Sequence, residues 1–350
     1  MDPVLEPGTQ AAVLGLLTEH VRLTSHGRPC PPSIDPMPVP APEGWVVHQW
    51  TVRCPEPGAP VITSTLLLDV APSHLHFVRA ELPDGAVREA VLSVAQTSWA
   101  LADGGASSAA NAQGTTLAGY VWLGIEHIAT GYDHLAFVLA LLLLAASLGE
   151  VAALVTGFTL AHSLTLALAV LGVLHPQQAA VEALIGFSIA LVAAENSWLL
   201  GGRPRAVPWA VALGLVALAV AALAGHGAVA APTFLGLALF AWCHFGLLDR
   251  AQRPARLRAA VAFAFGLIHG FGFAGVLAEM ELPADRLAAA LFGFNVGVEI
   301  GQLAIVAAAW PLLRLLAGAS AGRWHIRVAE VGSAAICGLG LYWFLVRAFG

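Results

Sequence analysis

The chain has 350 residues, of which 58% are hydrophobic and only 11% are charged, and its formal net charge is −6. A mean hydropathy of +0.77 is too high for a soluble globular domain and is typical of a chain that crosses a lipid bilayer several times. All 16 basic residues are arginines and they form no basic block, so the composition argues against nucleic acid as a partner.

Residues 1–113 are predicted to form a small β-rich domain, folded as a sandwich or a compact meander. The clearest strand signal lies at residues 45–54, where the sequence alternates with the period of two that a half-buried strand requires. One face of that strand carries Val46, His48, Trp50 and Val52.

Two further strands are expected at residues 76–82 and 86–94, with a turn at Pro83-Asp84-Gly85 between them. The proline-rich residues 29–42 are expected to form an irregular surface loop. Residues 103–116 are rich in Gly, Ser, Ala and Asn, a composition typical of a flexible linker. We therefore place the domain boundary near residue 113.

The four cysteines fall into two classes. Cys30 and Cys54 lie in the polar N-terminal region and are a candidate disulfide, the alternative being two free thiols. Cys243 and Cys337 lie in apolar runs, where a thiol behaves as a small hydrophobe.

No secretory signal is visible at the start of the chain. It opens with Met1-Asp2-Pro3 instead of a basic segment, and its one early apolar run is residues 11–17. We expect either that the native start lies upstream or that the first spanning helix carries the N-terminal domain across the membrane.

Residues 114–350 are predicted to form a polytopic α-helical membrane bundle of eight spans. Each span is close to the roughly 20 residues that a hydrocarbon core about 30 Å thick requires. The spans lie at residues 118–147, 151–173, 178–200, 207–224, 231–248, 258–278, 286–313 and 326–347.

The arginines predict the orientation of this bundle, because cytoplasmic loops retain positive charge. With the N-terminal domain outside, nine arginines lie in inner loops, against only Arg286 and Arg347 on the outer side. The acidic residues 279–285 then also lie outside, and the first cysteine pair faces an oxidising space. The inner arginines are Arg203, Arg205, Arg250, Arg253, Arg256, Arg258, Arg314, Arg323 and Arg327.

A stripe of polar residues lies inside the first predicted span, within about 120° of arc on a straight helix. Its members are Glu126, His127, Thr130, Asp133 and His134. A charged side chain near the bilayer centre costs roughly 2.5–3.5 kcal/mol, so such residues face a cavity or one another. The alternative is a hydrogen-bonded seam that only holds helices together.

The spacing of the two histidines restricts how they bind an ion. His127 and His134 are two turns apart, roughly 10.5 Å in rise, so one ion reaches both only if the helix unwinds between them. Gly131 is the expected place for such unwinding. Otherwise we expect ligands from several helices, with Asp133 fixing the tautomer of a histidine ring.

Other spans carry polar residues that suit the same site. The seventh span presents a narrow polar face of Asn295, Glu299 and Gln302. His162 lies in the second span, and Glu195 and Asn196 lie in the third. His269 lies in the sixth span beside Gly266 and Gly270, whose small-xxx-small spacing predicts close helix packing.

Most of these residues fall in the outer half or the middle of the bilayer in the predicted topology, among them the histidines, Asn295 and Glu299. This common depth indicates one shared site. Imidazole, carboxylate and amide donors without thiolate suit a borderline divalent ion such as nickel, cobalt, zinc or copper(II). The same residues also suit a proton relay. We expect His127, Asp133, His134, His162, His269 and Glu299 as metal-binding residues, supported by Glu126, Thr130, Glu195, Asn196, Asn295 and Gln302.

Three stretches resemble the HupE/UreJ family of bacterial membrane proteins. They are residues 126–134, with the spacing His-x5-Asp-His, residues 157–166, and residues 265–274. Glu195-Asn196 and residues 294–299 are similar to further family positions, and an N-terminal domain is typical of a divergent branch. The resemblance implies a nickel or cobalt uptake protein of the bacterial inner membrane, with His127, Asp133 and His134 as the metal-binding set.

We therefore predict a permease for a divalent transition metal (nickel, cobalt or zinc), which is a transporter in preference to an enzyme. It is embedded in a lipid bilayer, and the pattern is compatible with a homo-oligomer. One alternative is an intramembrane metal-dependent hydrolase, although no His-Glu-x-x-His spacing occurs. Another is an accessory protein that binds a metal, or haem between two histidines.

Overall fold

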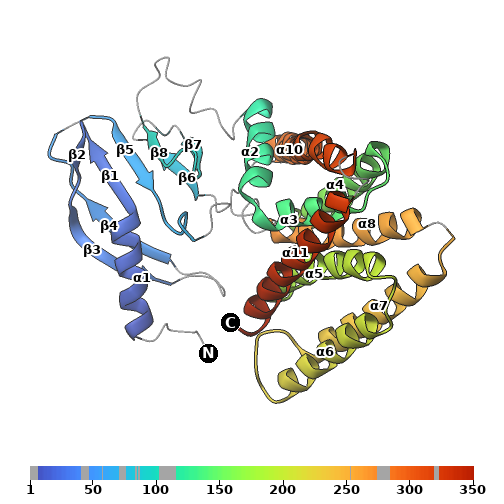
Figure 1. Cartoon of the computed structure of the whole chain (residues 1–350). Coiled ribbons are helices and arrows are strands. Elements are labelled where there is room, and N and C mark those ends of the chain that lie inside the picture. The colour runs from blue at the N-terminus through green and yellow to red at the C-terminus, as the bar shows by residue number, and fades with distance from the viewer. Residues whose placement is uncertain are drawn as a thin grey trace. The chain divides into compact units, whose positions relative to one another are not determined.

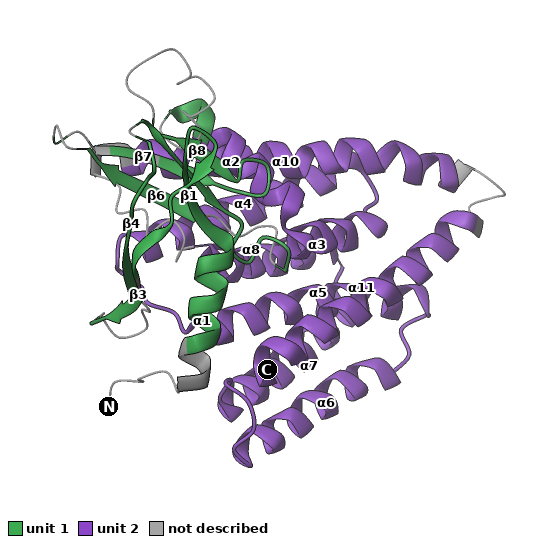
Figure 2. Cartoon of the chain, turned by 90° about the vertical axis from the view of Figure 1, so that its left-hand side faces the viewer, with its two compact units in different colours: residues 1–119 green, residues 120–350 purple. Residues whose placement is uncertain are grey.

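A computed structural model covers the whole chain (Figure 1). It divides into two compact units, residues 1–119 and residues 120–350 (Figure 2). The residues that the structure describes are 7–40, 47–56, 58–70, 76–82, 85, 87–101, 116–252, 254–273, 284–318 and 323–350.

The N-terminal unit opens with a helix, α1 (Pro7–His20), and continues into a four-stranded antiparallel sheet. Its strands, in spatial order, are β2 (Arg28–Pro29), β1 (Val21–Ser25), β5 (Pro60–Ser64) and β8 (Ser98–Ala100). His26 and Gly27 join β1 to β2, with φ values of 51° and 74°. A two-residue hairpin needs positive φ at both positions, because that twist matches the flanking strands.

Two antiparallel ribbons complete this unit. One pairs β3 (Pro32–Val39) with β4 (Val47–Val52), and the other pairs β6 (His76–Glu81) with β7 (Val87–Leu92). The strands predicted near residues 45–54, 76–82 and 86–94 are thereby confirmed. In β4 the alternate residues His48, Trp50 and Val52 are half-buried, as the pattern predicted.

The predicted irregular loop at residues 29–42 is wrong, because most of it forms β3. The prolines are tolerated since β3 has a single partner strand and its register shifts between Pro32 and Ile34 and between Ile34 and Met37. A disulfide joins Cys30 to Cys54. Cys30 directly precedes Pro31, and Cys54 lies two residues after the end of β4. The Pro83-Asp84 part of the predicted turn and nearly all of the predicted linker lie outside the described residues.

The rest of the chain is helical. The helices are α2 (Leu117–Thr130), α3 (Tyr132–Leu143), α4 (Leu148–Val170), α5 (Gln178–Leu200), α6 (Ala206–Leu223), α7 (Ala231–Arg250), α8 (Pro254–Gly272), α10 (Ala284–Gly318) and α11 (Arg323–Phe349).

Six helices in the described part of the chain are long and apolar enough to cross a membrane, which makes this a membrane protein. They are α4, α5, α6, α7 and the greater parts of α10 and α11. These six helices differ from the eight predicted spans at two places. The first predicted span is divided into the shorter helices α2 and α3, and α8 opens with Arg256 and Arg258, which lower its hydropathy.

Helix packing in this unit follows small residues. α4 packs extensively against α8, where Gly266 lies against the backbone of Phe158 and Gly270 lies against the backbone of His162. A Cβ atom at either glycine would collide with α4. The small-xxx-small pattern of α8 therefore brings two histidine-bearing helices into close contact.

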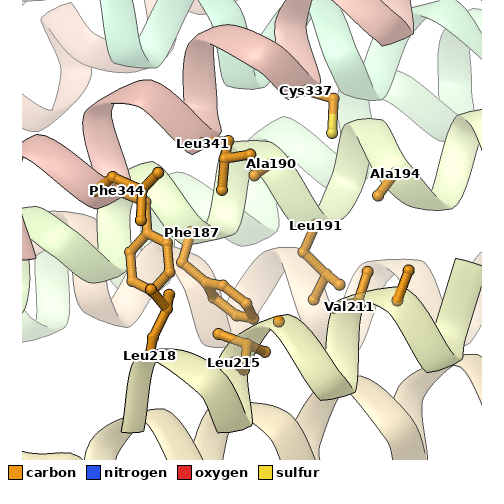
Figure 3. Close-up of a pocket in the computed structure, with 13 residues that line it drawn as sticks. Phe187, Ala190, Leu191, Ala194, Val211, Leu215, Leu218, Cys337, Leu341 and Phe344 are labelled. Carbon is orange, nitrogen blue, oxygen red and sulfur yellow. The ribbon is translucent and has the colours of Figure 1, made fainter. Parts of the chain in front are cut away.

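An apolar cavity of about 400 Å³ lies between α5, α6 and α11 (Figure 3). Phe187, Leu215 and Phe344 line it, with Cys337 at one end. Its lining carries no ionisable nitrogen or carboxylate, so it is separate from the polar residues that the sequence singles out.

Candidate metal site

The first predicted span breaks at Gly131, which is one of the two arrangements expected from the histidine spacing. α2 ends at Thr130 and α3 begins at Tyr132, and Gly131 has a non-helical ψ of 89°. The break brings the ring centroids of His127 and His134 to 4.8 Å, instead of the roughly 10.5 Å of rise on a straight helix. The unwinding expected at Gly131 is confirmed.

Three buried histidines converge at this break. One ring nitrogen from each of His127, His134 and His162 lies within 4.8 Å of the other two. They come from α2, α3 and α4. The structure therefore combines the two arrangements considered from the sequence, a break in the first span and ligands from several helices. A group of imidazole nitrogens at this separation is suited to a single transition-metal ion.

A fourth imidazole lies next to this group. The ring centroid of His269, on α8, is 5.3 Å from that of His134, and the side chain is 1% exposed. We call His127, His134, His162 and His269 the histidine cluster.

The ring of His134 is oriented by its neighbour in the sequence. Its Nδ1 lies 3.1 Å from Oδ1 of Asp133, which also accepts the backbone N–H of His134 at 2.9 Å. The second carboxylate oxygen lies 3.6 Å from Arg347 Nη2 at the end of α11. Because the carboxylate accepts only, Nδ1 carries the proton and Nε2 keeps its lone pair.

The ring of His162 is oriented from α10. Its Nδ1 lies 3.3 Å from Oδ1 of Asn295, whose amide nitrogen donates to the backbone carbonyl of Leu291 at 2.8 Å. That second bond fixes which end of the amide faces the ring, so Nδ1 of His162 is the donor. Its Nε2 therefore keeps its lone pair as well.

The ring of His269 is oriented by Ser188 of α5, a residue that the sequence analysis missed. Ser188 Oγ donates to the carbonyl of Ile185 at 2.7 Å, so it accepts from His269 Nε2 at 2.9 Å. The lone pair of His269 then lies on Nδ1. A buried serine in an apolar helix gives no signal in the sequence beyond its polarity.

The ring nitrogens of the histidine cluster that take no part in these hydrogen bonds have no hydrogen-bond partner. They are Nε2 of His134, Nε2 of His162, Nδ1 of His269 and both ring nitrogens of His127, and all are buried. A buried polar atom without a partner costs about 1–3 kcal/mol, so several in one place indicate a missing ligand. A cation that accepts one lone pair from each ring satisfies four of these five nitrogens, since a neutral His127 ring has a single lone pair.

Phenylalanine rings pack against the histidine cluster. Phe273 and Phe294 stack with centroids 4.4 Å apart, and the ring of His127 lies 4.5 Å from Phe273. Phe158 lies 5.0 Å from His269. An apolar shell of this kind limits access of water and strengthens metal–ligand interactions.

The polar residues farther along α10 form their own contacts. Glu299 Oε1 accepts from the Thr156 hydroxyl at 2.6 Å, and Gln302 lies 3.0 Å from the Thr159 hydroxyl. Glu299 and Thr156 line a separate groove of about 450 Å³ between α4 and α10. The structure therefore does not bring Glu299 into the histidine cluster. On α2, Thr130 bonds to the backbone carbonyl of Glu126 at 2.8 Å.

The third-span pair Glu195-Asn196 also lies outside the histidine cluster. Asn196 donates to the carbonyl of Ala140 at 2.7 Å. Glu195 contacts His244 and Arg258, which the sequence analysis did not single out. Both are ionisable residues near the ends of predicted spans, which is the signal that could have identified them.

Comparison with known proteins gives one match. The sequence model of a family described as HupE / UreJ protein matches residues 105–227 and 234–347, which is more than half of the chain. No curated protein and no solved structure matches the chain.

Proposed function

Because the chain belongs to the HupE/UreJ family, whose members are membrane proteins associated with nickel and cobalt handling, we propose that it transports a divalent transition-metal ion. The ion is the substrate, and the histidine cluster is its binding site within the helix bundle. Nickel, cobalt and zinc all suit four imidazole donors.

One observation carries this proposal: ring nitrogens of three buried histidines, from α2, α3 and α4, lie within 4.8 Å of one another, with the ring of His269 on α8 beside them. A neighbouring group orients three of the four rings. His134, His162 and His269 supply Nε2, Nε2 and Nδ1, while Asp133, Asn295 and Ser188 hold the opposite nitrogens. Residues that only packed helices together would bond to one another instead of leaving these atoms without partners.

We propose the topology that the arginines predicted, in a bacterial inner membrane. α2 and α3 together cross once, and α8 crosses despite its two arginines, which gives eight crossings with the N-terminal unit outside. In this topology the histidine cluster lies in the outer half or the middle of the bilayer. The ion enters from the outer side, and the groove beside Glu299 and Thr156 supplies oxygen ligands along α10.

The test is metal uptake into proteoliposomes by the full chain and by Asp133→Asn. Losing the carboxylate that orients His134 is expected to abolish uptake of Ni²⁺ and to weaken its binding about 10–100-fold. Asp249→Asn is the matched control, because Asp249 is exposed and pairs with Arg203 at 3.4 Å. Normal uptake by Asp133→Asn contradicts the role given to the cluster.

A hydrolase is the second candidate, since buried imidazoles also suit a zinc-bound water. It needs a carboxylate that faces the metal, and Asp133 and Glu299 are held by His134 and Thr156. Zinc retained at one ion per chain without any uptake would favour the hydrolase over the transporter. A purified sample without a haem absorption band excludes the haem-binding form of the accessory role.

A further inference from the structure

A second group of buried ionisable residues joins four helices. Glu195 Oε2 lies 2.8 Å from His244 Nε2, and Glu195 Oε1 lies 3.0 Å from Arg258 Nε. Arg258 Nη1 also lies 3.9 Å from Glu150 at the start of α4. We call these four residues the charge cluster.

The charge cluster is remote from the histidine cluster. Glu195 lies seven residues beyond Ser188 on α5, a rise of about 10 Å, and Arg258 lies eleven residues before His269 on α8, about 16 Å. In the proposed topology, all four residues lie at the cytoplasmic ends of their helices.

The burial of this cluster calls for a function. Glu195, His244 and Arg258 are 2%, 3% and 7% exposed. Ionisable groups this deep in a membrane bundle are expensive and usually mark an ion or proton pathway. With a neutral imidazole, the buried Glu195 and Arg258 balance each other, and the half-buried Glu150, which also accepts the backbone N–H of Ala146, adds one carboxylate at the edge of the cluster. One further positive charge balances all four residues.

His244 has the atom that can supply that charge. Its Nε2–H donates to Glu195, and its Nδ1 is buried without a hydrogen-bond partner. The ionisable side chains that face it are Glu195 from α5 and Arg258 from α8, with Glu150 of α4 behind Arg258. α6, which packs against α7, carries no ionisable side chain. A proton on Nδ1 gives an imidazolium that keeps its bond to Glu195.

The helices of the histidine cluster also meet at the charge cluster. α8 carries both Arg258 and His269, and α5 carries both Glu195 and Ser188. Asn196, beside Glu195, bonds to α3, whose first turn carries His134. A change in the Glu195 contacts therefore acts on the helices that hold and orient the metal ligands.

We propose that His244, held by Glu195 and balanced by Arg258, is a proton-binding site whose occupancy is coupled to metal transport. The proton enters from the cytoplasmic side and binds Nδ1, and no other bond is made or broken at the imidazole. This inference rests on the proposed transport function and adds its second substrate, the proton.

The experiment measures proton and metal movement together. The full chain is reconstituted in phosphatidylethanolamine–phosphatidylglycerol vesicles that contain a pH-sensitive dye, with the membrane potential clamped by potassium and valinomycin. On addition of Ni²⁺, uptake is expected to accompany a change of internal pH. His244→Gln is expected to bind Ni²⁺ in detergent with unchanged affinity and to reduce the pH change at least tenfold. His175→Gln, in an exposed loop, is expected to match the unaltered protein.

The outcomes separate this inference from the transport function. Ni²⁺ uptake by the unaltered protein without a pH change, or a full pH change in His244→Gln, overturns the proton site and leaves transport intact. Absence of uptake contradicts the transport function instead. Nitrogen NMR of ¹⁵N-histidine protein then tests the site directly, because the signal of the imidazole that gains the proton must be missing in His244→Gln. If that variant does not fold, Glu195→Gln replaces it, with the same loss expected.

Discussion

At the scale of single residues, the proposed metal site depends on the hydrogen-bond partners of the histidines as well as on the histidines themselves. Asp133, Asn295 and Ser188 each hold one ring nitrogen and so determine which nitrogen faces the centre of the cluster. Such partners fix ring orientation and the basicity of the ligand nitrogen. Asp133 and Asn295 were predicted from their polar stripes, while Ser188 was recognised only from its bond to His269.

Ser188→Ala is therefore expected to weaken Ni²⁺ binding about tenfold or more, because the ring of His269 loses the acceptor that fixes its tautomer. Isothermal titration of the purified protein in detergent measures this. Ser197→Ala is the matched control, since Ser197 lies on the same helix and bonds only to the carbonyl of Ala193. Equal affinities in the two variants would show that Ser188 has no positioning role.

At the scale of helices, backbone breaks and close contacts place the ligands. At the break at Gly131, the ring centroids of the first two histidines lie 4.8 Å apart, although the two residues are seven positions apart in the sequence. The glycines of α8 then set the distance from α4, which carries His162, to α8, which carries His269. Small residues serve membrane bundles in this way because lipid supplies no hydrophobic force between helices.

Gly270→Ala tests the helix contact. The added Cβ meets the carbonyl of His162 and the hydroxyl of Thr165, so α4 and α8 must separate, which typically costs about 1–3 kcal/mol. We expect a lower unfolding temperature and weaker Ni²⁺ binding, measured by thermal unfolding and titration in detergent. Gly236→Ala on α7 has open space around the new Cβ and is expected to leave both unchanged. A Gly270→Ala protein with unaltered affinity would disprove this link.

At the scale of the whole molecule, the chain consists of two compact units with different stabilising features. The N-terminal unit has a small core around Leu92 and Trp99 and a disulfide that closes a 24-residue separation. The helical unit buries a much larger apolar core that includes Phe137, Phe158 and Phe234. The two units should therefore respond independently to changes in either one.

A double variant, Cys30→Ser with Cys54→Ser, tests that independence. Opening a loop of this length is expected to destabilise the N-terminal unit by roughly 3–4 kcal/mol. Limited proteolysis of the full chain should then cut faster within residues 1–119, with Ni²⁺ affinity unchanged. A loss of affinity in the double variant would indicate that the units depend on each other.

The sequence by itself determined the membrane class, the family and most of the polar residues of the site. The hydropathy of a segment indicates whether it lies in lipid or in water. The spacing of His127 and His134 required either a break in the helix or ligands from several helices. The strands of the N-terminal unit followed from alternation. The same local reasoning failed for β3, because proline content disfavours a strand and only the pairing with β4 overrides it.

Only the tertiary structure decided which polar residues meet. Glu299 and His162 look equally suitable along the chain, but a ring nitrogen of His162 lies within 4.8 Å of those of His127 and His134, while Glu299 bonds to Thr156 in a groove between α4 and α10. Glu195, predicted as a supporting residue of the metal site, instead meets His244 and Arg258. The physical reason is that the sequence of one helix indicates only the depth of a residue in the membrane and the side of the helix on which it lies. Which residues of two helices touch depends on the packing angle between the helices and on where small residues let them approach, and neither can be read from one segment alone.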